Sequence, residues 1–211
     1  MDVIAALSLT RLVPVVVLDD TAHADGLAAA LIAGGLAIAE VTLRTDAALE
    51  SIRVMAARGD IVVGAGTVLT TAQVDDVVAA GASFVVSPGL SRPVVERCLE
   101  HGVLAFPGAV TATEIQAALE LGVTTVKFFP ASTSGGVAAI AALAAPFGGV
   151  GFVPTGGVTP ENLAGYLAVP AVVAVGGSWM VPRGRVNAGD FAGITELTAA
   201  AVALEKGLDR G

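Results

Sequence analysis

The chain has 211 residues, of which 55% are hydrophobic and 14% charged, and its formal net charge is −8. This length fits one domain with a large buried core, and the apolar composition excludes intrinsic disorder. The single cysteine excludes an internal disulfide framework and a cysteine-based zinc site, while the negative charge argues against a nucleic-acid or anionic-membrane partner.

Short β-branched segments recur along the whole chain, and each is followed by a helical pattern. Eight such segments are expected to be strands: Val13–Leu18, Ile38–Leu43, Ile61–Thr67, Ser83–Pro88, Leu104–Val110, Thr125–Pro130, Gly151–Gly157 and Val172–Gly176. Eight strand–helix units predict one (β/α)8 barrel, a single domain over residues 1–211, with a short helix at Asp2–Leu9 covering its bottom. An open doubly wound sheet is the alternative, but Asp19-Asp20 follows the first strand where that fold usually has a glycine-rich loop.

Helix-start signals lie between the expected strands. Thr111 and Glu114 form a capping-box pattern, Ser91 precedes Pro93, and Thr159-Pro160 and Ser178-Trp179 follow the last two glycine-rich strand ends. Residues 128–160 carry no charge, yet their prolines and glycines favour two strands around one helix over a membrane span. The N-terminus lacks a signal-peptide pattern, so we expect a soluble, cytoplasmic protein.

Two charged residues interrupt apolar strands, and alternation along a strand predicts which side chains point into the barrel. In the second strand Ala39, Val41 and Leu43 suit the helix side, which turns Glu40 inward. In the sixth strand the same alternation turns Lys127 inward, where desolvation disfavours its ammonium form. A neutral amine of this kind is a nucleophile that forms Schiff bases with carbonyl compounds. A purely structural Lys127–Glu40 ion pair is the alternative.

Small and glycine-rich segments end three other strands. Thr67 is expected to point inward with the parity of Val63 and Ala65, beside space left by small residues. Thr155-Gly156-Gly157 and Gly176-Gly177-Ser178 precede expected helix starts at the end of the barrel where phosphate commonly binds. Because neither loop contains lysine or arginine, backbone amides and helix N-termini are expected to hold the anion. Glycines that merely make tight turns are the alternative interpretation.

The remaining reactive residues are expected to be structural. His23 and His101 lack carboxylates at metal-ligand spacing, so we expect no metal site. Cys98 lies in a helix and is interpreted as a small packing residue. Trp179 either shapes the loop around Ser178 or packs in the core.

Several sequence blocks together resemble the 2-keto-3-deoxy-6-phosphogluconate (KDPG) aldolase family. The similarity runs from about Val13 to about Asp190, in the family's order and spacing. Its blocks are Glu40-Val-Thr-Leu-Arg44-Thr45, Gly64-Ala-Gly-Thr67-Val-Leu69, Ser87-Pro88-Gly89, Lys127-Phe-Phe-Pro-Ala131, Pro154-Thr-Gly-Gly157 and Gly176-Gly-Ser-Trp179. Asp19-Asp20 departs from the pattern, because relatives often have basic residues there.

The resemblance implies a class I aldolase without metal or cofactor that cleaves KDPG into pyruvate and glyceraldehyde 3-phosphate, a step of the Entner–Doudoroff pathway. It implies that Lys127 forms the Schiff base and that Glu40 is the general acid/base. The implied substrate-binding residues are Arg44, Thr67, Pro88 and Phe129 at the pyruvate end and Thr155, Gly156, Gly157, Gly177 and Ser178 at the phosphate end. It also implies a homotrimer and a second activity on 4-hydroxy-2-oxoglutarate.

Three other functions remain open on the sequence. One is an aldolase of the same chemistry that acts on the galactonate epimer or mainly on 4-hydroxy-2-oxoglutarate, because loop geometry decides the stereochemistry at C4. Another is a non-catalytic barrel that binds a phosphorylated sugar, with Lys127 and Glu40 as a structural pair. A third is a phosphate-barrel isomerase or synthase, which would use an aspartate or cysteine base instead of Lys127.

Overall fold

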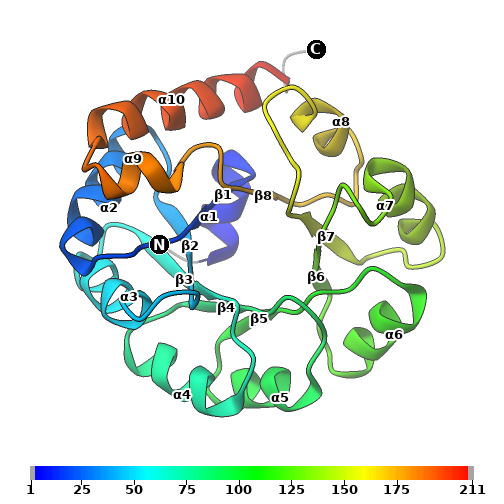
Figure 1. Ribbon diagram of the computed structural model, residues 1–211. Coiled ribbons are helices and arrows are strands. Elements are labelled where there is room, and N and C mark those ends of the chain that lie inside the picture. The colour runs from blue at the N-terminus through cyan, green and yellow to red at the C-terminus, as the bar shows by residue number, and fades with distance from the viewer. Residues whose placement is uncertain (1–2, 209–211) are drawn as a thin grey trace.

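The computed structural model describes residues 3–208, in which strands alternate with helices. In Figure 1 the strands lie in a central ring and most of the helices lie outside it. In chain order the elements are α1 (Val3–Thr10), β1 (Leu12–Val16), the 3-10 helix η1 (Thr21–His23), α2 (Ala24–Ala33), β2 (Ile38–Thr42), α3 (Ala48–Ala57), β3 (Val62–Gly66), α4 (Thr71–Ala79), β4 (Phe84–Val86), α5 (Arg92–Glu100), β5 (Leu104–Phe106), α6 (Ala112–Glu120), β6 (Thr125–Phe128), α7 (Gly136–Ala144), β7 (Gly151–Pro154), α8 (Leu163–Leu167), β8 (Val175–Gly177), α9 (Arg183–Asn187) and α10 (Phe191–Leu208).

The strand pairing is parallel throughout. Six strands form one sheet in the order β5-β4-β3-β2-β1-β8, and β6 pairs with β7 in a second sheet. Isolated parallel bridges connect the two sheets, from Gly108 to Lys127 at one side and from Thr155 to Gly176 at the other. The expected α/β class is therefore confirmed, with consecutive strands as neighbours from β1 to β5.

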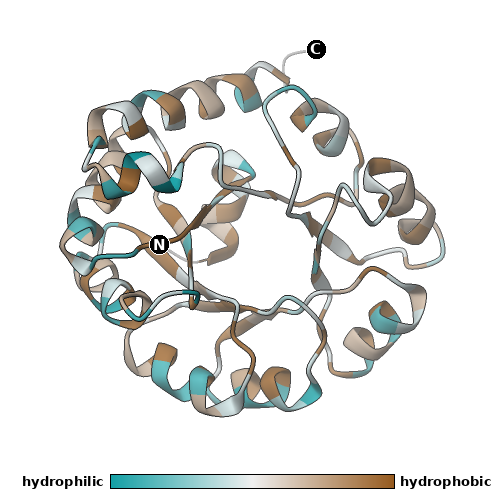
Figure 2. Cartoon of the chain, in the orientation of Figure 1, coloured by the Kyte–Doolittle hydropathy of each residue, from teal (hydrophilic) through white to brown (hydrophobic). Residues whose placement is uncertain are grey.

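Two hydrophobic clusters explain why the helices surround the strands. The larger cluster joins outward-facing strand residues such as Val41 and Val126 to the inner faces of the helices. The smaller one fills the interior near the amino ends of the strands, where Leu7 of α1 packs with Ile38 and Phe84. Figure 2 shows hydrophobic residues prevailing on the strands, while the outer helices carry hydrophobic and hydrophilic residues together. The expected helix at the bottom is confirmed over Val3–Thr10, while Asp2 lies outside the described residues.

The helix starts expected at Ser91 and Thr111 are confirmed, with α5 beginning at Arg92 and α6 at Ala112. Thr111 accepts a hydrogen bond from the Glu114 amide, and the Glu114 side chain accepts one from the Thr111 amide, which completes the capping box of α6. The uncharged segment 128–160 folds as the end of β6, helix α7 and strand β7. Among residues 3–208, no helix is both long and apolar enough to cross a membrane.

The expected parity of β3 is wrong. Val63 and Ala65 pack in the outer cluster with the helices, so Gly64 and Gly66 face the interior. The interior neighbours explain this register: a Cβ on Gly64 would lie 2.2 Å from the Phe84 ring, and one on Gly66 would lie 2.2 Å from Oε1 of Glu40. Only residues without a side chain fit at these two positions.

Candidate active site

Lys127 and Glu40 meet inside the ring of strands. Nζ of Lys127 on β6 donates a 3.0 Å hydrogen bond to Oε1 of Glu40 on β2, and the side chains are 8% and 4% exposed. Nζ also lies 5.2 Å from the centre of the Phe129 ring. The alternation of each strand puts its neighbours on the outside, since Val41, Val126 and Phe128 belong to the outer cluster. Burying two charges is costly, and their mutual hydrogen bond offsets part of that cost.

Gly66 makes room for the carboxylate and was not identified from the sequence. In the β2–β3 ladder Glu40 pairs with Gly64 and Thr42 pairs with Gly66. Gly66 therefore lies two residues beyond the partner of Glu40, on the same face of the sheet. Because any Cβ on Gly66 would overlap Glu40, this glycine fixes where the carboxylate sits. The signal was present in the Gly64-Ala65-Gly66 pattern, which puts a glycine at every second position of a strand.

A cavity of about 200 Å³ opens above the pair and contains most of the predicted residues. Five predicted substrate-binding residues line it together with Lys127 and Glu40, namely Arg44, Thr67, Pro88, Phe129 and Thr155. Val15 and Thr42 line it as well and were not predicted. The structure therefore brings together side chains from six different strands or the loops that follow them.

Arg44 supplies a guanidinium group to this cavity. Its Nε donates to Oγ1 of Thr42 at 3.1 Å, and that hydroxyl donates to the Val16 carbonyl at 2.8 Å. Among residues 3–208, no carboxylate lies within 4.0 Å of the Arg44 guanidinium. Thr42 thus orients the guanidinium by one edge and leaves further N–H groups to pair with an anionic ligand.

Thr67 reaches the cavity through an unusual backbone conformation. Its φ is +59°, in the left-handed region, where a β-branched residue costs about 1–3 kcal/mol. Strand β3 ends at Gly66, so the alternation that would have turned Thr67 outward no longer applies. Thr67 lines the cavity, although the parity argument that turned it inward is wrong. Strain of this kind is typical of functional positions.

The loop after β7 contains two glycines in the left-handed region. Gly156 and Gly157 have φ of +93° and +78°, and the carbonyl of Gly156 accepts a 3.0 Å hydrogen bond from the Ser132 amide. Within the described part of the chain, the amide of Gly157 donates to no acceptor, whereas the amide of Gly156 faces the Gly176 carbonyl across the parallel bridge between Thr155 and Gly176. Successive glycine amides in such a turn form a concavity that suits an anion. Ser132 was missed from the sequence, and it packs so close to Gly157 that a Cβ there would lie 2.2 Å from its Oγ.

The second glycine loop lies at another cavity, of about 390 Å³. Ser178 and Trp179 line it, and so do Val15 and Arg44, which also line the smaller cavity beside Lys127. Gly177 is required by Trp179, because a Cβ at this position would lie 1.7 Å from the indole ring. Of the two interpretations of Trp179, its position beside Ser178 in the cavity wall therefore favours shaping of this loop.

The two expected helix starts at these loops are wrong. Helix α8 begins at Leu163 rather than at Thr159-Pro160, because Asn162 accepts from the Thr159 amide and donates to the Gly157 carbonyl, which extends the turn. Helix α9 begins at Arg183 rather than at Ser178, since Pro182 disfavours helical backbone in the residue before it. The helix N-termini therefore do not abut the glycines as expected.

The residues interpreted as structural lie away from both cavities. Cys98 is buried among helix and strand side chains, and burial raises the pKa of its thiol to about 11. His101 pairs with Asp75 on the outer surface, and His23 makes an edge contact with Phe191. In the part of the chain that the structure describes, no three His, Cys, Asp or Glu side chains group as a metal site would require.

Known proteins of one family match most of the chain. A family model described as "Aldolase: KDPG and KHG aldolase" matches residues 3–197. The chain belongs to this family. It is 52% identical over 194 residues to the 2-dehydro-3-deoxy-phosphogluconate aldolase of Treponema pallidum, with 92% of each chain covered, and 44% identical over 191 residues to the KHG/KDPG aldolase of Escherichia coli K12, with 90% of each covered.

A solved structure of the family extends the similarity to the fold. The KDPG aldolase from Legionella pneumophila, with pyruvate captured as a covalent carbinolamine intermediate, superposes with a TM-score of 0.91 at 38% identity, covering 94% of this chain and 97% of that one. The resemblance inferred from the sequence blocks is thereby confirmed.

Proposed function

We propose that the protein is a class I aldolase that cleaves KDPG into pyruvate and glyceraldehyde 3-phosphate. The observation that carries the proposal is the buried contact of 3.0 Å between Lys127 and Glu40 at the base of a cavity of about 200 Å³. Lys127 is the nucleophile and Glu40 is the general acid/base. A structural ion pair alone gives no reason for the cavity above it, for the strained Thr67 or for the unpaired Arg44.

The first half of the reaction builds the imine. The neutral amine of Lys127 attacks the C2 ketone, and the resulting carbinolamine loses water to give a protonated imine. Glu40 is within hydrogen-bond distance of Nζ, so it takes one proton from the Lys127 ammonium and thereby frees the amine for attack. After the attack the nitrogen passes a second proton to the former ketone oxygen, and Glu40 returns the first one to the resulting hydroxyl, which leaves as water. One carboxylate therefore serves both of these steps.

The second half breaks the carbon–carbon bond. A base removes the proton of the C4 hydroxyl, the C3–C4 electron pair moves into the protonated imine, and glyceraldehyde 3-phosphate leaves as the aldehyde. The remaining enamine takes a proton at C3, and water attacks the imine carbon to release pyruvate and free Lys127. Because the protonated imine is the electron sink, the proposed reaction uses no metal or cofactor.

The pyruvate end of the substrate is assigned to the cavity around Lys127. Arg44 pairs with the carboxylate through N–H groups that Thr42 leaves free. Thr67 supplies a hydroxyl, while Pro88 and Phe129 form apolar walls that exclude water from the imine.

The phosphate end is assigned to the two glycine loops. The amides of this loop, above all the unpaired amide of Gly157, donate to phosphate oxygens, and Ser178 adds its exposed hydroxyl. Thr155 lies between this loop and the cavity of Lys127, and Gly177 lets Trp179 close the wall. A second activity on 4-hydroxy-2-oxoglutarate, which yields pyruvate and glyoxylate, needs the pyruvate end alone.

The broader architecture completes the proposal. We propose that the two sheets are one closed (β/α)8 barrel in a single domain, a geometry that the bridges Gly108–Lys127 and Thr155–Gly176 at both seams support. A homotrimer in the cytoplasm, acting on a phosphorylated 2-keto acid, is the proposed state of the enzyme.

A pyruvate-release assay on three substrates tests the function. KDPG, its galactonate epimer at C4 and 4-hydroxy-2-oxoglutarate are compared by kcat/KM, and KDPG is expected to be cleaved most efficiently. Borohydride with pyruvate should then modify Lys127 and leave Lys206, the exposed second lysine of the chain, unchanged. Preference for the epimer would reassign the substrate, and active enzyme without an adduct on Lys127 would refute the Schiff base.

A further inference from the structure

An ion pair spans the loops after β1 and β8 beside the larger cavity. Arg183 donates twice to the carboxylate of Asp19, from Nε to Oδ2 at 2.7 Å and from Nη2 to Oδ1 at 2.5 Å. Asn187, one helical turn later in α9, donates its amide Nδ2 to the same Oδ2 at 2.7 Å. These three hydrogen bonds hold the pKa of Asp19 at about 2, the Arg183 bonds being the largest cause and the Asn187 bond the next.

This geometry leaves one side of the Arg183 guanidinium unused. A guanidinium has five N–H groups, and Asp19 takes two of them from the Nε and Nη2 edge. Within residues 3–208, Nη1 of Arg183 donates to no acceptor, and Asp19 is the only carboxylate within 4.0 Å of this side chain. The pair is therefore fixed in orientation at one edge and open at the other.

Arg183 borders the cavity that carries Ser178. Arg183 lines that cavity of about 390 Å³ together with Ser178, Trp179 and Arg44. Arg44 and Val15 also line the cavity of Lys127, so the two spaces adjoin. A ligand anchored at Lys127 and extending toward Ser178 thus approaches Arg183.

We infer that Arg183 is a specificity-determining residue that binds the phosphate of the substrate, and that Asp19 and Asn187 are positioning residues that hold its guanidinium at the mouth of the site. The inference rests on the proposed aldolase function. It adds a cation to the backbone amides and the Ser178 hydroxyl that were expected to hold the anion, and it takes the place of the helix N-terminus expected at Ser178, since α9 begins at Arg183. It also gives Asp19, the departure from the family pattern, a role: Asp19 is matched by a cation from the opposite loop rather than left to repel the substrate.

The inference predicts a split between two substrates. Arg183→Met should raise the KM for KDPG roughly tenfold or more, the size of one lost charge-assisted hydrogen bond, with kcat little changed. The KM for 4-hydroxy-2-oxoglutarate should stay within about twofold, because that substrate has no phosphate. Arg183→Lys should give an intermediate KM for KDPG, since an ammonium keeps the charge and loses the planar fork.

Arg185→Met is the matched control. Arg185 lies on the same short helix and pairs with Asp190 at 2.8 Å, outside the residues that line the cavity. The Arg185→Met substitution removes the same positive charge from α9 as Arg183→Met does, so its KM for KDPG should equal that of the wild type. Equal increases for Arg183→Met and Arg185→Met would mean that only the overall charge matters, and equal losses on both substrates would mean that Arg183 shapes the pocket; either result overturns the inference.

A binding measurement separates this inference from the proposed function. Inorganic phosphate, titrated by phosphorus NMR, should bind the wild type and Arg185→Met alike and bind Arg183→Met several-fold more weakly. Phosphate binding unchanged in Arg183→Met would refute the anion role of Arg183 whether or not the enzyme cleaves KDPG. Conversely, a wild type that releases no pyruvate would refute the aldolase function, while a selective loss of phosphate binding would still support the site.

Discussion

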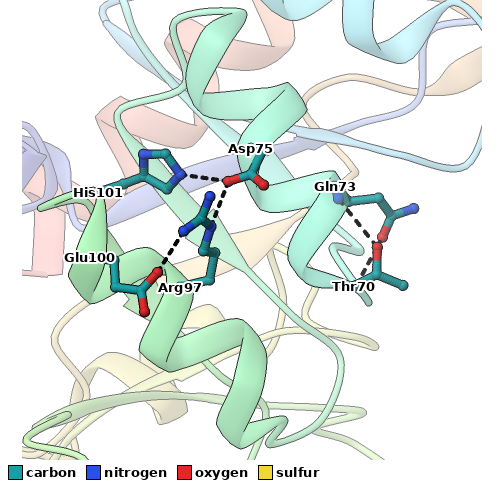
Figure 3. Close-up of polar contacts among 6 residues, drawn as sticks. All are labelled: Thr70, Gln73, Asp75, Arg97, Glu100 and His101. Atoms are coloured by element: carbon teal, nitrogen blue, oxygen red, sulfur yellow. Dashed lines mark hydrogen bonds and ion pairs between the residues drawn. The ribbon is translucent and has the colours of Figure 1, made fainter.

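Two ion-pair clusters of this protein have similar distances and opposite surroundings. Lys127 and Glu40 meet at 3.0 Å inside the ring of strands, where the side chains are 8% and 4% exposed. Asp75 of α4 meets Arg97 of α5 at 2.7 Å and His101 at 2.6 Å on the outer surface, where the side chains are 42%, 38% and 30% exposed. Figure 3 shows the outer cluster with Glu100, which binds the far side of Arg97, and with the Thr70–Gln73 capping box at the start of α4.

The distance between two charged atoms alone does not identify a functional pair. Water screens the outer cluster, so each of its charges tolerates the loss of a partner. The inner pair has little contact with water, and each charge depends on the other one. Two buried charges next to a cavity cost free energy of folding that apolar side chains at the same positions would not cost. The outer cluster, by contrast, ties two neighbouring helices together at little cost in free energy.

The largest expected effect follows from removing the nucleophile. Lys127→Met should abolish pyruvate release and borohydride trapping, because no other lysine lies in the cavity. It should also lower the free energy of unfolding at pH 7 by about 3–5 kcal/mol, since Glu40 is left buried without its partner. Urea unfolding and activity assays measure the two effects separately.

A double variant tests whether the lost stability comes from the unpaired carboxylate of Glu40. Lys127→Met with Glu40→Gln removes both charges, so most of the lost stability should return while activity stays absent. If the double variant were as unstable as the single one, the loss would come from packing rather than from the unpaired carboxylate.

The next effect is the loss of general acid/base catalysis. Glu40→Gln keeps the shape beside Gly66 and removes the proton-transfer group, so kcat should fall about 10²–10⁴-fold. The matched surface variant Asp75→Asn changes one oxygen in the same way and should leave kcat unaltered. A Glu40→Gln enzyme that unfolds, with a normal rate in its folded fraction, would support the structural ion pair instead.

A third prediction concerns the anion site. Ser178→Asp brings a carboxylate to the proposed phosphate position, so the KM for KDPG should rise strongly, by roughly tenfold or more. The KM for 4-hydroxy-2-oxoglutarate should change little, since this substrate shares only the pyruvate end. Initial-rate kinetics on both substrates measure the split, and equal changes would place the phosphate elsewhere.

The sequence predicted the two buried charged residues well because charge is conspicuous in an apolar strand. Lys127 and Glu40 stand out by alternation alone, and the structure brings them within hydrogen-bond distance. Thr67 was found by a wrong parity argument, since its positive φ and the inward Gly64 and Gly66 cannot be read from alternation. Arg183 was missed because its role depends on Pro182 delaying a helix and on Asp19 from the other end of the chain.

A smaller effect is expected from relieving backbone strain. Thr67→Gly removes the unfavourable left-handed conformation of a β-branched residue, at an entropic cost of about 0.5–1 kcal/mol in the unfolded chain. The free energy of unfolding should therefore change by about 1 kcal/mol or less, while kcat/KM falls because the hydroxyl is lost from the cavity. Thr67→Ser keeps the hydroxyl and should retain more activity. A large loss of stability in Thr67→Gly would show that the side chain contributes packing rather than function.

The smallest effect concerns the outer cluster and its dependence on pH. The hydrogen bonds from Arg97 and then from His101 lower the pKa of Asp75 below its ordinary 3.8, so the folded state binds the proton less tightly than the unfolded chain. The stabilisation by Asp75 is therefore complete above pH 3.8 and disappears as the pH falls through the lowered value.

Asp75→Asn should melt slightly below the wild type at pH 7, and the difference should vanish in acid and shrink in high salt. Asp76→Asn, one residue later on α4 and without an ion pair among the described residues, should show no such acid-dependent difference. Thermal melts across pH 3–7 make the comparison, and a difference that persists in acid would mean that Asp75 acts through helix packing rather than through its charge.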